Sequence, residues 1–210
     1  MISNPERHTD AHLTYCLNIH PGETWAENLD AISTRACLVR DRLGWKGPFG
    51  LGLRLSAQAA RELAEPDALE CFRGFMTDNG LYAFTVNGFP YGTFHGTRVK
   101  ERVYAPDWTC PERVDYTLQL AHILAALLPE GCHGSISTVP GTYRAWAQPG
   151  VEATIIDNLI LVVNQLADIE ATTGRRVVLA LEPEPDCLWD RSSQLVKLFR
   201  ETLPRLGHTR

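Results

Sequence analysis

The sequence predicts an α/β protein with a parallel β-sheet. Short apolar segments typical of strands alternate with amphipathic segments typical of helices along the whole chain. The segments between successive strands contain helices of about ten or more residues, which is the connection that parallel strands require. With 210 residues, of which 44% are hydrophobic, the chain is expected to form one domain over residues 1–210.

The first predicted strand is His12 to His20, with the sequence HLTYCLNIH. Apolar residues at steps of three and four then predict a helix from Trp25 to Leu43. Thr24 and Glu27 have the spacing of a capping box, in which each side chain accepts the other residue's backbone N–H. We therefore expect the helix to begin directly after Thr24.

The second predicted strand is Phe49 to Leu55, followed by a short helical turn from Ala57 to Ala64. Asp67 and Glu70 are expected to cap the next helix, because an acidic side chain can accept the first free N–H groups of a helix. Gly80 is expected to end that helix.

The third predicted strand is Leu81 to Val86. Thr109 with Glu112 again has capping-box spacing and predicts the start of a helix that extends to Leu128. Ser135 to Val139 is the fourth predicted strand.

The last part of the chain repeats the alternation. An apolar stripe from Val151 to Ile169 predicts a helix that ends before Gly174. Val177 to Leu181 is the fifth predicted strand, and Ser193 to Leu203 is the last predicted helix.

Two architectures fit five βα units: an open doubly wound sheet, and the first five units of a (βα)8 barrel. Successive strands begin about 41 residues apart, so eight units would need roughly 330 residues. The chain contains five units. A G-x-G-x-x-G turn after the first strand and a P-loop are both absent, which argues against the usual nucleotide-binding sites. Spacing alone leaves both architectures open.

Composition and charge exclude several classes of protein. The formal net charge is -5 and no dense Lys/Arg block occurs, which argues against nucleic acid or an anionic membrane as the main partner. The polar amino terminus does not resemble a signal peptide, and no segment approaches the roughly 18 apolar residues of a membrane helix. A cytoplasmic protein is expected.

Polar residues follow or end all five predicted strands, where both architectures place their binding sites. An ordinary turn explains each of them separately, whereas five together favour a shared pocket. The residues, in strand order, are Asn18 and His20, Arg54 and Ser56, Asn87, Ser137 and Thr138, and Glu182 and Glu184.

Glu182 and Glu184 stand two residues apart at the end of the fifth predicted strand. Side chains at positions i and i+2 of an extended chain point the same way, so both carboxylates are expected on the face that carries Val178 and Ala180. Such a pair is typical of a metal or acid–base site. The alternative is a pair of solvated residues in a strand-to-helix turn.

The longest connection follows the third strand, over Phe89 to Trp108, and mixes aromatic with basic residues. Its cations are suited to a phosphate or carboxylate, and its aromatic rings to the wall of a pocket. The alternative is that the rings only hold the loop against the body of the domain. The residues concerned are His95, Arg98, Lys100 and Arg102, with Tyr91, Phe94 and Trp108.

The sequence indicates no serine or cysteine nucleophile. A G-x-S-x-G elbow is absent, no two cysteines form a C-x-x-C pair, and no cysteine has a local catalytic signature. We interpret most cysteines as small buried hydrophobic residues. They are Cys16, Cys37, Cys71, Cys110, Cys132 and Cys187.

Five blocks of sequence resemble the EboE family, whose members are called metabolite traffic proteins and have a xylose-isomerase-like TIM-barrel fold. The resemblance extends over nearly the whole chain. The blocks are HLTYCLNIHPGETWAENL, PFGLGLRLSAQAARELAEPDAL, GLYAFTVNGFPYGTFHGTRVKERVYAPDW, GSISTVPGTYR and LALEPEPDC.

This resemblance implies a (βα)8 barrel of which the chain carries the first five βα units. It implies a role in moving or preparing a small metabolite for export or biosynthesis, such as a terpenoid-type or indole-alkaloid precursor. Other proteins of the same gene cluster are the partners that it implies. An unclosed five-strand section also exposes an edge, which is expected to favour dimerisation, pairing with a separate chain that carries the second half of the barrel, or aggregation.

The resemblance also implies a metal site in a full-length protein. Members of the wider superfamily bind a divalent ion such as Mg, Mn or Zn through carboxylates and histidines at strand ends. The first ligand is typically a glutamate after the fifth strand, and Glu182 matches that position. Glu184 is a second ligand or a group that orients the first. The remaining ligands come from strands six to eight of such barrels, which are not expected among these 210 residues.

Two functional hypotheses follow. In the first, the chain binds a metabolite without transforming it, through Asn18, Arg54, Asn87 and the residues Tyr91, His95 and Lys100 of the long loop. In the second, it is a metal-dependent isomerase or epimerase of sugar-type substrates. Glu182 then holds the ion, and His20 or Glu184 moves the proton.

Overall fold

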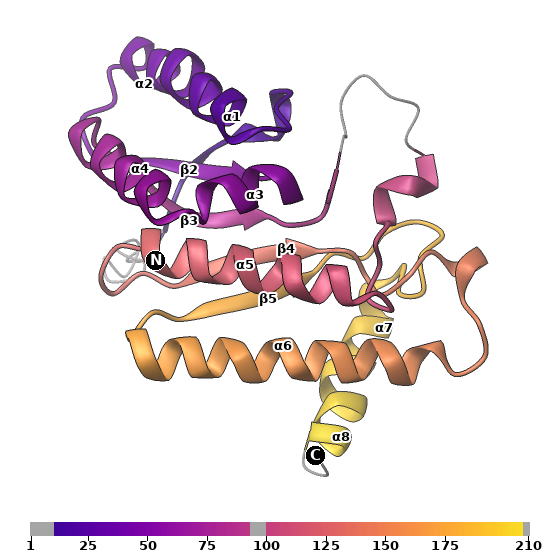
Figure 1. Cartoon of the computed structure of the whole chain (residues 1–210). Coiled ribbons are helices and arrows are strands. Elements are labelled where there is room, and N and C mark those ends of the chain that lie inside the picture. The colour runs from indigo at the N-terminus through magenta and orange to yellow at the C-terminus, as the bar shows by residue number, and fades with distance from the viewer. Residues whose placement is uncertain (1–10, 93–99, 208–210) are drawn as a thin grey trace, which may run out of the picture.

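Five parallel strands form one sheet in the order of the sequence, β1-β2-β3-β4-β5. The computed structural model describes residues 11–92 and 100–207 (Figure 1). The prediction of an α/β protein with a parallel sheet is confirmed. The strands are β1 Thr14–Cys16, β2 Phe49–Arg54, β3 Leu81–Asn87, β4 Gly134–Thr138 and β5 Val177–Leu181.

A helical segment follows each strand. Two of these segments contain a π-helical turn, so that α1 runs into α2 and α7 runs into α8 as continuous helical segments. The elements are α1 Trp25–Ala31, the turn Ile32–Ala36, α2 Cys37–Arg42, α3 Ala57–Leu63, α4 Pro66–Asp78, α5 Pro111–Leu127, α6 Val151–Thr173, α7 Ser192–Lys197, the turn Leu198–Thr202 and α8 Leu203–Gly207. Short 3-10 turns occupy Leu17–Ile19, Lys100–Tyr104 and Arg144–Trp146.

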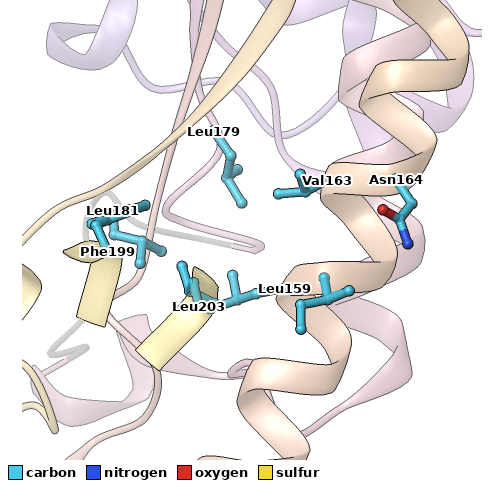
Figure 2. A pocket seen from close by; sticks show the side chains of 8 residues that line it. Leu159, Val163, Asn164, Leu179, Leu181, Phe199 and Leu203 are labelled. Atoms are coloured by element: carbon cyan, nitrogen blue, oxygen red, sulfur yellow. The ribbon is translucent and has the colours of Figure 1, made fainter. Parts of the chain in front are cut away.

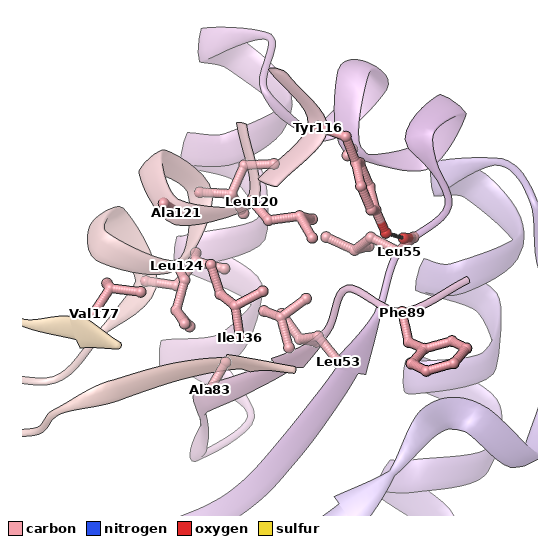
Figure 3. Packing of buried hydrophobic residues seen from close by; sticks show 14 of the residues in the cluster. Leu53, Leu55, Ala83, Phe89, Tyr116, Leu120, Ala121, Leu124, Ile136 and Val177 are labelled. Carbon is pink, nitrogen blue, oxygen red and sulfur yellow. Dashed lines mark hydrogen bonds between the residues drawn. The ribbon is translucent and has the colours of Figure 1, made fainter. Parts of the chain in front are cut away.

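The strand order has no reversal, so successive right-handed crossovers place the connecting helices on one face of the sheet. A doubly wound sheet reverses its order and carries helices on both faces. The main core lies between the sheet and α5, where Leu120 and Leu124 pack over Ile136 and Leu53 (Figure 3). All four side chains are at most 1% exposed.

The other face of the sheet is polar at its centre. Ser135 Oγ donates to Thr85 Oγ1 over 2.9 Å, linking β4 to β3. On the neighbouring β5, Val178 is 41% exposed, whereas Val177 beside it is buried toward the helices. The sheet therefore has one apolar, helix-covered face and one partly exposed face.

The structure corrects the extent of the first strand. β1 ends at Cys16, and the chain then turns through the 3-10 segment Leu17–Ile19, closed by a hydrogen bond from the His20 N–H to the Leu17 carbonyl. Leu17 is buried while Ile19 is 65% exposed, so the segment does not continue the alternation of a strand. Asn18 and His20 therefore lie in a turn.

Of the three predicted helix caps, one is confirmed. Glu27 N–H donates to Thr24 Oγ1, and Thr24 N–H donates to a Glu27 carboxylate oxygen, which is a complete capping box. The Asp67 cap is wrong, since α4 already begins at Pro66. The Thr109 cap is also wrong, since α5 begins at Pro111. Proline needs no N–H partner and fixes the first residue of a helix, which sets both starting points.

An apolar groove of about 190 Å³ lies between α6, β5 and the carboxyl-terminal helical segment. Figure 2 shows Leu179 and Leu181 of β5 facing it, with Val163 on one side and Phe199 and Leu203 on the other. Val163 and Phe199 are about half exposed. Among residues 11–92 and 100–207, no helix has the length and apolar character needed to cross a membrane.

Candidate functional site

Arg54, at the end of β2, ties together the loops that follow β1 and β3. Its guanidinium donates to the Gly22 carbonyl, to a Glu23 carboxylate oxygen at 3.0 Å and to the Gly92 carbonyl at 3.1 Å. The side chain is only 1% exposed, and its Nε is a buried donor without a partner among the described residues. Arg54 therefore shapes the loops, and one of its N–H groups remains to be satisfied.

His20 and Asn18 lie beside this cluster in the turn after β1. Tyr15 Oη lies 2.8 Å from His20 Nε2, and the two rings are stacked. Asn18 Oδ1 is buried without a partner among the described residues. His20 borders a cavity of about 480 Å³, which it shares with residues of the first helical segment. The residues lining that cavity do not include Glu182 or Glu184.

Asn87 and Ser137 meet at the carboxyl ends of β3 and β4. Asn87 Oδ1 accepts the Phe89 N–H at 2.9 Å and the Ser137 hydroxyl at 3.3 Å. Thr138 is fully buried, and its hydroxyl has no partner among the described residues. Ser56 accepts the Ala59 N–H as the N-cap of α3. These polar groups mainly satisfy the local backbone.

The structure describes some of the residues predicted to bind a ligand in the long loop after β3, but not all of them. Tyr91 is half-buried, and its ring packs edge-on against Tyr116 with centroids 5.2 Å apart. His95 lies outside the described residues, as does the side chain of Lys100. Trp108 is fully buried and donates from Nε1 to the Val139 carbonyl at 3.1 Å. Trp108 therefore holds the loop against the body, which is the second of the two roles considered for its aromatic residues.

Glu182 and Glu184 are both partly exposed at the carboxyl end of β5. Burial raises the pKa of Glu184, and the neighbouring charge of Glu182 raises it further. The two carboxylates are thus close enough to interact, as their spacing predicts. The Glu182 N–H donates to the Thr138 carbonyl at 3.0 Å, which holds this segment beside β4.

Aromatic side chains from separate loops form a wall near Glu184. Tyr104 and Tyr143 are stacked, with centroids 5.7 Å apart and ring planes 10° apart. Phe89 packs edge-on against Tyr104, and Trp146 packs edge-on against Tyr143. Tyr104 Oη lies 3.4 Å from the Pro185 carbonyl, directly after Glu184. We call Phe89, Tyr104, Tyr143 and Trp146 the aromatic wall.

The electrostatics of Tyr104 connect the wall to the carboxylates. Burial raises the pKa of Tyr104 to about 12, with further contributions from Cys187 and Glu184. At neutral pH Tyr104 therefore keeps its hydroxyl proton. The sequence did not identify Tyr104, Tyr143 or Trp146 as site residues. Tyr143 and Trp146 stand close together after the fourth strand, and this pair of aromatic residues is the feature of the sequence that could have indicated the site.

The described residues do not complete a metal site. Within the part of the chain that the structure describes, no three His, Cys, Asp or Glu side chains converge as a set that could hold an ion. Glu182 and Glu184 therefore lack a third described donor. Divalent hard cations prefer about six oxygen ligands. We assign no reaction step to a metal here.

The Glu184 carboxylate predicts a specific dependence of stability on pH. Because its folded-state pKa lies above the ordinary value of 4.5, its contribution to stability is present below that value and lost as pH rises through the folded pKa. Glu184→Gln removes this loss. The free energy of unfolding of the variant minus that of the wild type is expected to grow with pH and then level off.

Urea unfolding at intervals from about pH 3 to pH 8 measures this difference. Glu182→Gln is the matched comparison, because it removes one of the two causes of the shift and should lower the Glu184 pKa. A difference between Glu184→Gln and wild type that stays constant over the whole range would contradict the assignment.

No protein-family model, curated protein or solved structure matches this chain.

Proposed function

We propose that the chain is an EboE-like metabolite-handling protein made of the first five βα units of a xylose-isomerase-like barrel. The sequential strand order supports this architecture, because a barrel adds each strand beside the previous one and keeps its helices on the outer face. The partly exposed face of β4 and β5 then corresponds to the barrel interior.

The apolar groove beside β5 supports the same proposal. β5 lies at one edge of the five-stranded sheet, and the groove beside it exposes Val163 and Phe199. In a barrel, the next βα unit covers this edge and this groove. We propose that such a unit, carried by a second-half chain or by further residues of the same protein, packs against Leu179 and Leu181.

We propose that the metabolite binds at the carboxyl end of the sheet, between the aromatic wall and the glutamate pair. The observation that carries this proposal is the stacked Tyr104–Tyr143 pair beside Glu184, assembled from loops after three different strands. Aromatic faces bind flat apolar rings, and neighbouring carboxylates favour a positive charge or a hydroxyl donor. A ligand with a ring and an ammonium or hydroxyl group fits both features.

Binding without reaction is the function that these residues support best. The alternative, a metal-dependent isomerase or epimerase, needs both a Lewis acid and a base. The described donors do not complete a metal site, and His20 borders a separate cavity. The isomerase stays a prediction for a barrel that includes further strands.

Tryptamine, which joins an indole ring to an ammonium group, is a suitable probe for this site. Calorimetric titration is expected to give saturable binding to the wild-type chain. Tyr143→Ala and Glu184→Gln are each expected to weaken it by about fivefold or more, because a stacked ring and a charged hydrogen bond each contribute roughly 1 kcal/mol or more.

Two controls make this test specific. Phe199→Ala changes the apolar groove and is expected to leave tryptamine binding unchanged. Indole-3-propionate has the same ring with a negative charge, and the glutamate pair is expected to reject it. Equal binding of both ligands, or wild-type affinity in Tyr143→Ala, would overturn the proposal.

A further inference from the structure

A thiol, an imidazole and a phenol meet at the amino-terminal end of the sheet, opposite to the glutamate pair. Cys132 precedes β4, His12 precedes β1, and Tyr82 is the second residue of β3. Cys132 Sγ lies 3.7 Å from His12 Nε2, and His12 Nδ1 lies 3.2 Å from Tyr82 Oη. The three groups form a chain in which the imidazole stands between the other two.

The position of His12 depends on Gly50 in β2. The segment before β1 crosses so close to β2 that a Cβ at residue 50 would overlap the Leu13 carbonyl oxygen and lie 3.3 Å from the Tyr82 ring. Glycine at this position lets His12 reach past β2 to β3. There its ring packs against Phe84, with centroids 4.7 Å apart. The imidazole is therefore held by Phe84 and Tyr82 together.

This arrangement is that of a nucleophile with its base and an orienting group. When the His12 ring proton is on Nδ1, it is donated to Tyr82 Oη, and Nε2 is free to accept the Cys132 thiol proton. Burial raises the pKa of the Cys132 thiol, so at neutral pH the sulfur carries its proton until a base takes it. His12 is placed to act as that base.

The thiol opens onto a cavity of about 570 Å³. His12, Tyr82 and Cys132 line it together with Pro48, Leu81 and Pro129. Among the described residues, its lining includes the acidic Glu130 and no lysine or arginine, so it disfavours a phosphate or a carboxylate. The space and its surface are suited to a small uncharged molecule.

We propose that Cys132 is a reactive thiol that accepts an acyl group from a small uncharged ester or thioester, with His12 as the base and Tyr82 as the positioning residue. The sulfur attacks the carbonyl carbon, and its proton passes to His12 Nε2. The bond from that carbon to the leaving oxygen or sulfur breaks, and the leaving group takes the proton from His12. The product is an acylated Cys132, and no oxidant or reductant is consumed.

A zinc site is the other chemistry that a thiol and an imidazole favour. It needs four ligands in a structural site or three in a catalytic one, and the described residues offer no set of three such side chains. The acyl-acceptor site therefore fits the described geometry better than a metal site.

The test uses the full chain and p-nitrophenyl acetate, an uncharged acyl donor. Peptide mapping by mass spectrometry measures acetylation of each cysteine, and absorbance follows the release of p-nitrophenol. Cys132 is expected to react faster than Cys16 and Cys71, which are the exposed cysteines. His12→Asn is expected to slow acetylation of Cys132 by about 100-fold, as general-base assistance is typically worth. Tyr82→Phe, which keeps the ring and removes the hydroxyl, is expected to give a smaller decrease.

Cys71→Ser is the matched control and should leave the rate at Cys132 unchanged. Circular dichroism of His12→Asn establishes that the variant is folded. If that variant does not fold, the comparison of Tyr82→Phe with wild type decides. The proposal is overturned if Cys132 reacts no faster than Cys71, or if the folded variants react at the wild-type rate. Because tryptamine binding uses the opposite end of the sheet, this result is independent of the proposed function.

Discussion

Arg113→Met is expected to lower the free energy of unfolding by about 3 to 5 kcal/mol, since two buried carbonyls and one partly buried carbonyl lose their donor. Arg113 is fully buried on α5, and its guanidinium donates to the carbonyls of Gly88, Phe89 and Pro106 over 2.7 to 3.1 Å. Each carbonyl left unsatisfied costs roughly 1 to 3 kcal/mol, and methionine recovers part of this through its apolar contacts.

Urea unfolding followed by circular dichroism measures this loss. Arg73→Met is the matched control, because Arg73 pairs with Glu70 on the exposed side of α4. Exposed ion pairs of this kind contribute little to folding stability, so Arg73→Met is expected to change the free energy of unfolding by less than about 1 kcal/mol. Similar small losses in both variants would contradict the role assigned to Arg113.

Burying the positive charge of Arg113 costs desolvation free energy, and the three hydrogen bonds offset that cost. Desolvation lowers the pKa of Arg113 to about 10, which is still far above neutral pH. The side chain is therefore a cation held by uncharged carbonyls. Those of Gly88 and Phe89 lie where the loop after β3 begins, and that of Pro106 lies near its end. Removal of the Arg113 side chain is expected to loosen the loop that carries Tyr104, so tryptamine binding should weaken together with stability.

Trp108→Ala is expected to cost about 3 to 5 kcal/mol, the usual loss for removing a large buried aromatic side chain. Trp108 is fully buried, its indole donates to the Val139 carbonyl, and its own carbonyl accepts from Asn158 Nδ2 at 2.8 Å. It therefore joins the loop after β3 to the end of β4 and to α6.

Thermal and urea unfolding of Trp108→Ala should be compared with Trp45→Ala. Trp45 is 44% exposed, and its removal is expected to cost much less. Trp108→Phe keeps most of the buried area and removes the donor, so its loss should fall between the two. A Trp108→Ala variant as stable as Trp45→Ala would contradict this account.

The sequence predicted the sheet well, because strands and helices leave periodic signals. The predicted fifth strand Val177 to Leu181 has the observed bounds, and the others except the first agree to within about one residue at each end. The first strand is an edge strand of three residues followed by a turn, and local pattern does not distinguish these. The predicted helix caps at Asp67 and Thr109 are wrong, because Pro66 and Pro111 are the first residues of these helices.

The sites were less predictable, because they depend on distant parts of the chain. The spacing of Glu182 and Glu184 predicts that they interact, whereas no spacing brings Tyr104 to Tyr143. His12 and Cys132 are 120 residues apart in sequence. The interpretation of most cysteines as buried is wrong, because only Cys37 and Cys187 are buried. Cys16 on the edge strand β1 and Cys71 on α4 are exposed, whereas Cys110 and Cys132 lie in connections and are partly exposed.

The sequential order of the strands also has a consequence for synthesis on the ribosome. Each new strand pairs with the strand that emerged just before it. Its pairing therefore does not require a segment that has not yet been synthesised. Domains that form contacts in this order can begin folding while the carboxyl-terminal part is still being made. The growing sheet keeps β1 at one edge, and its other unpaired edge moves from β2 to β5 as translation proceeds.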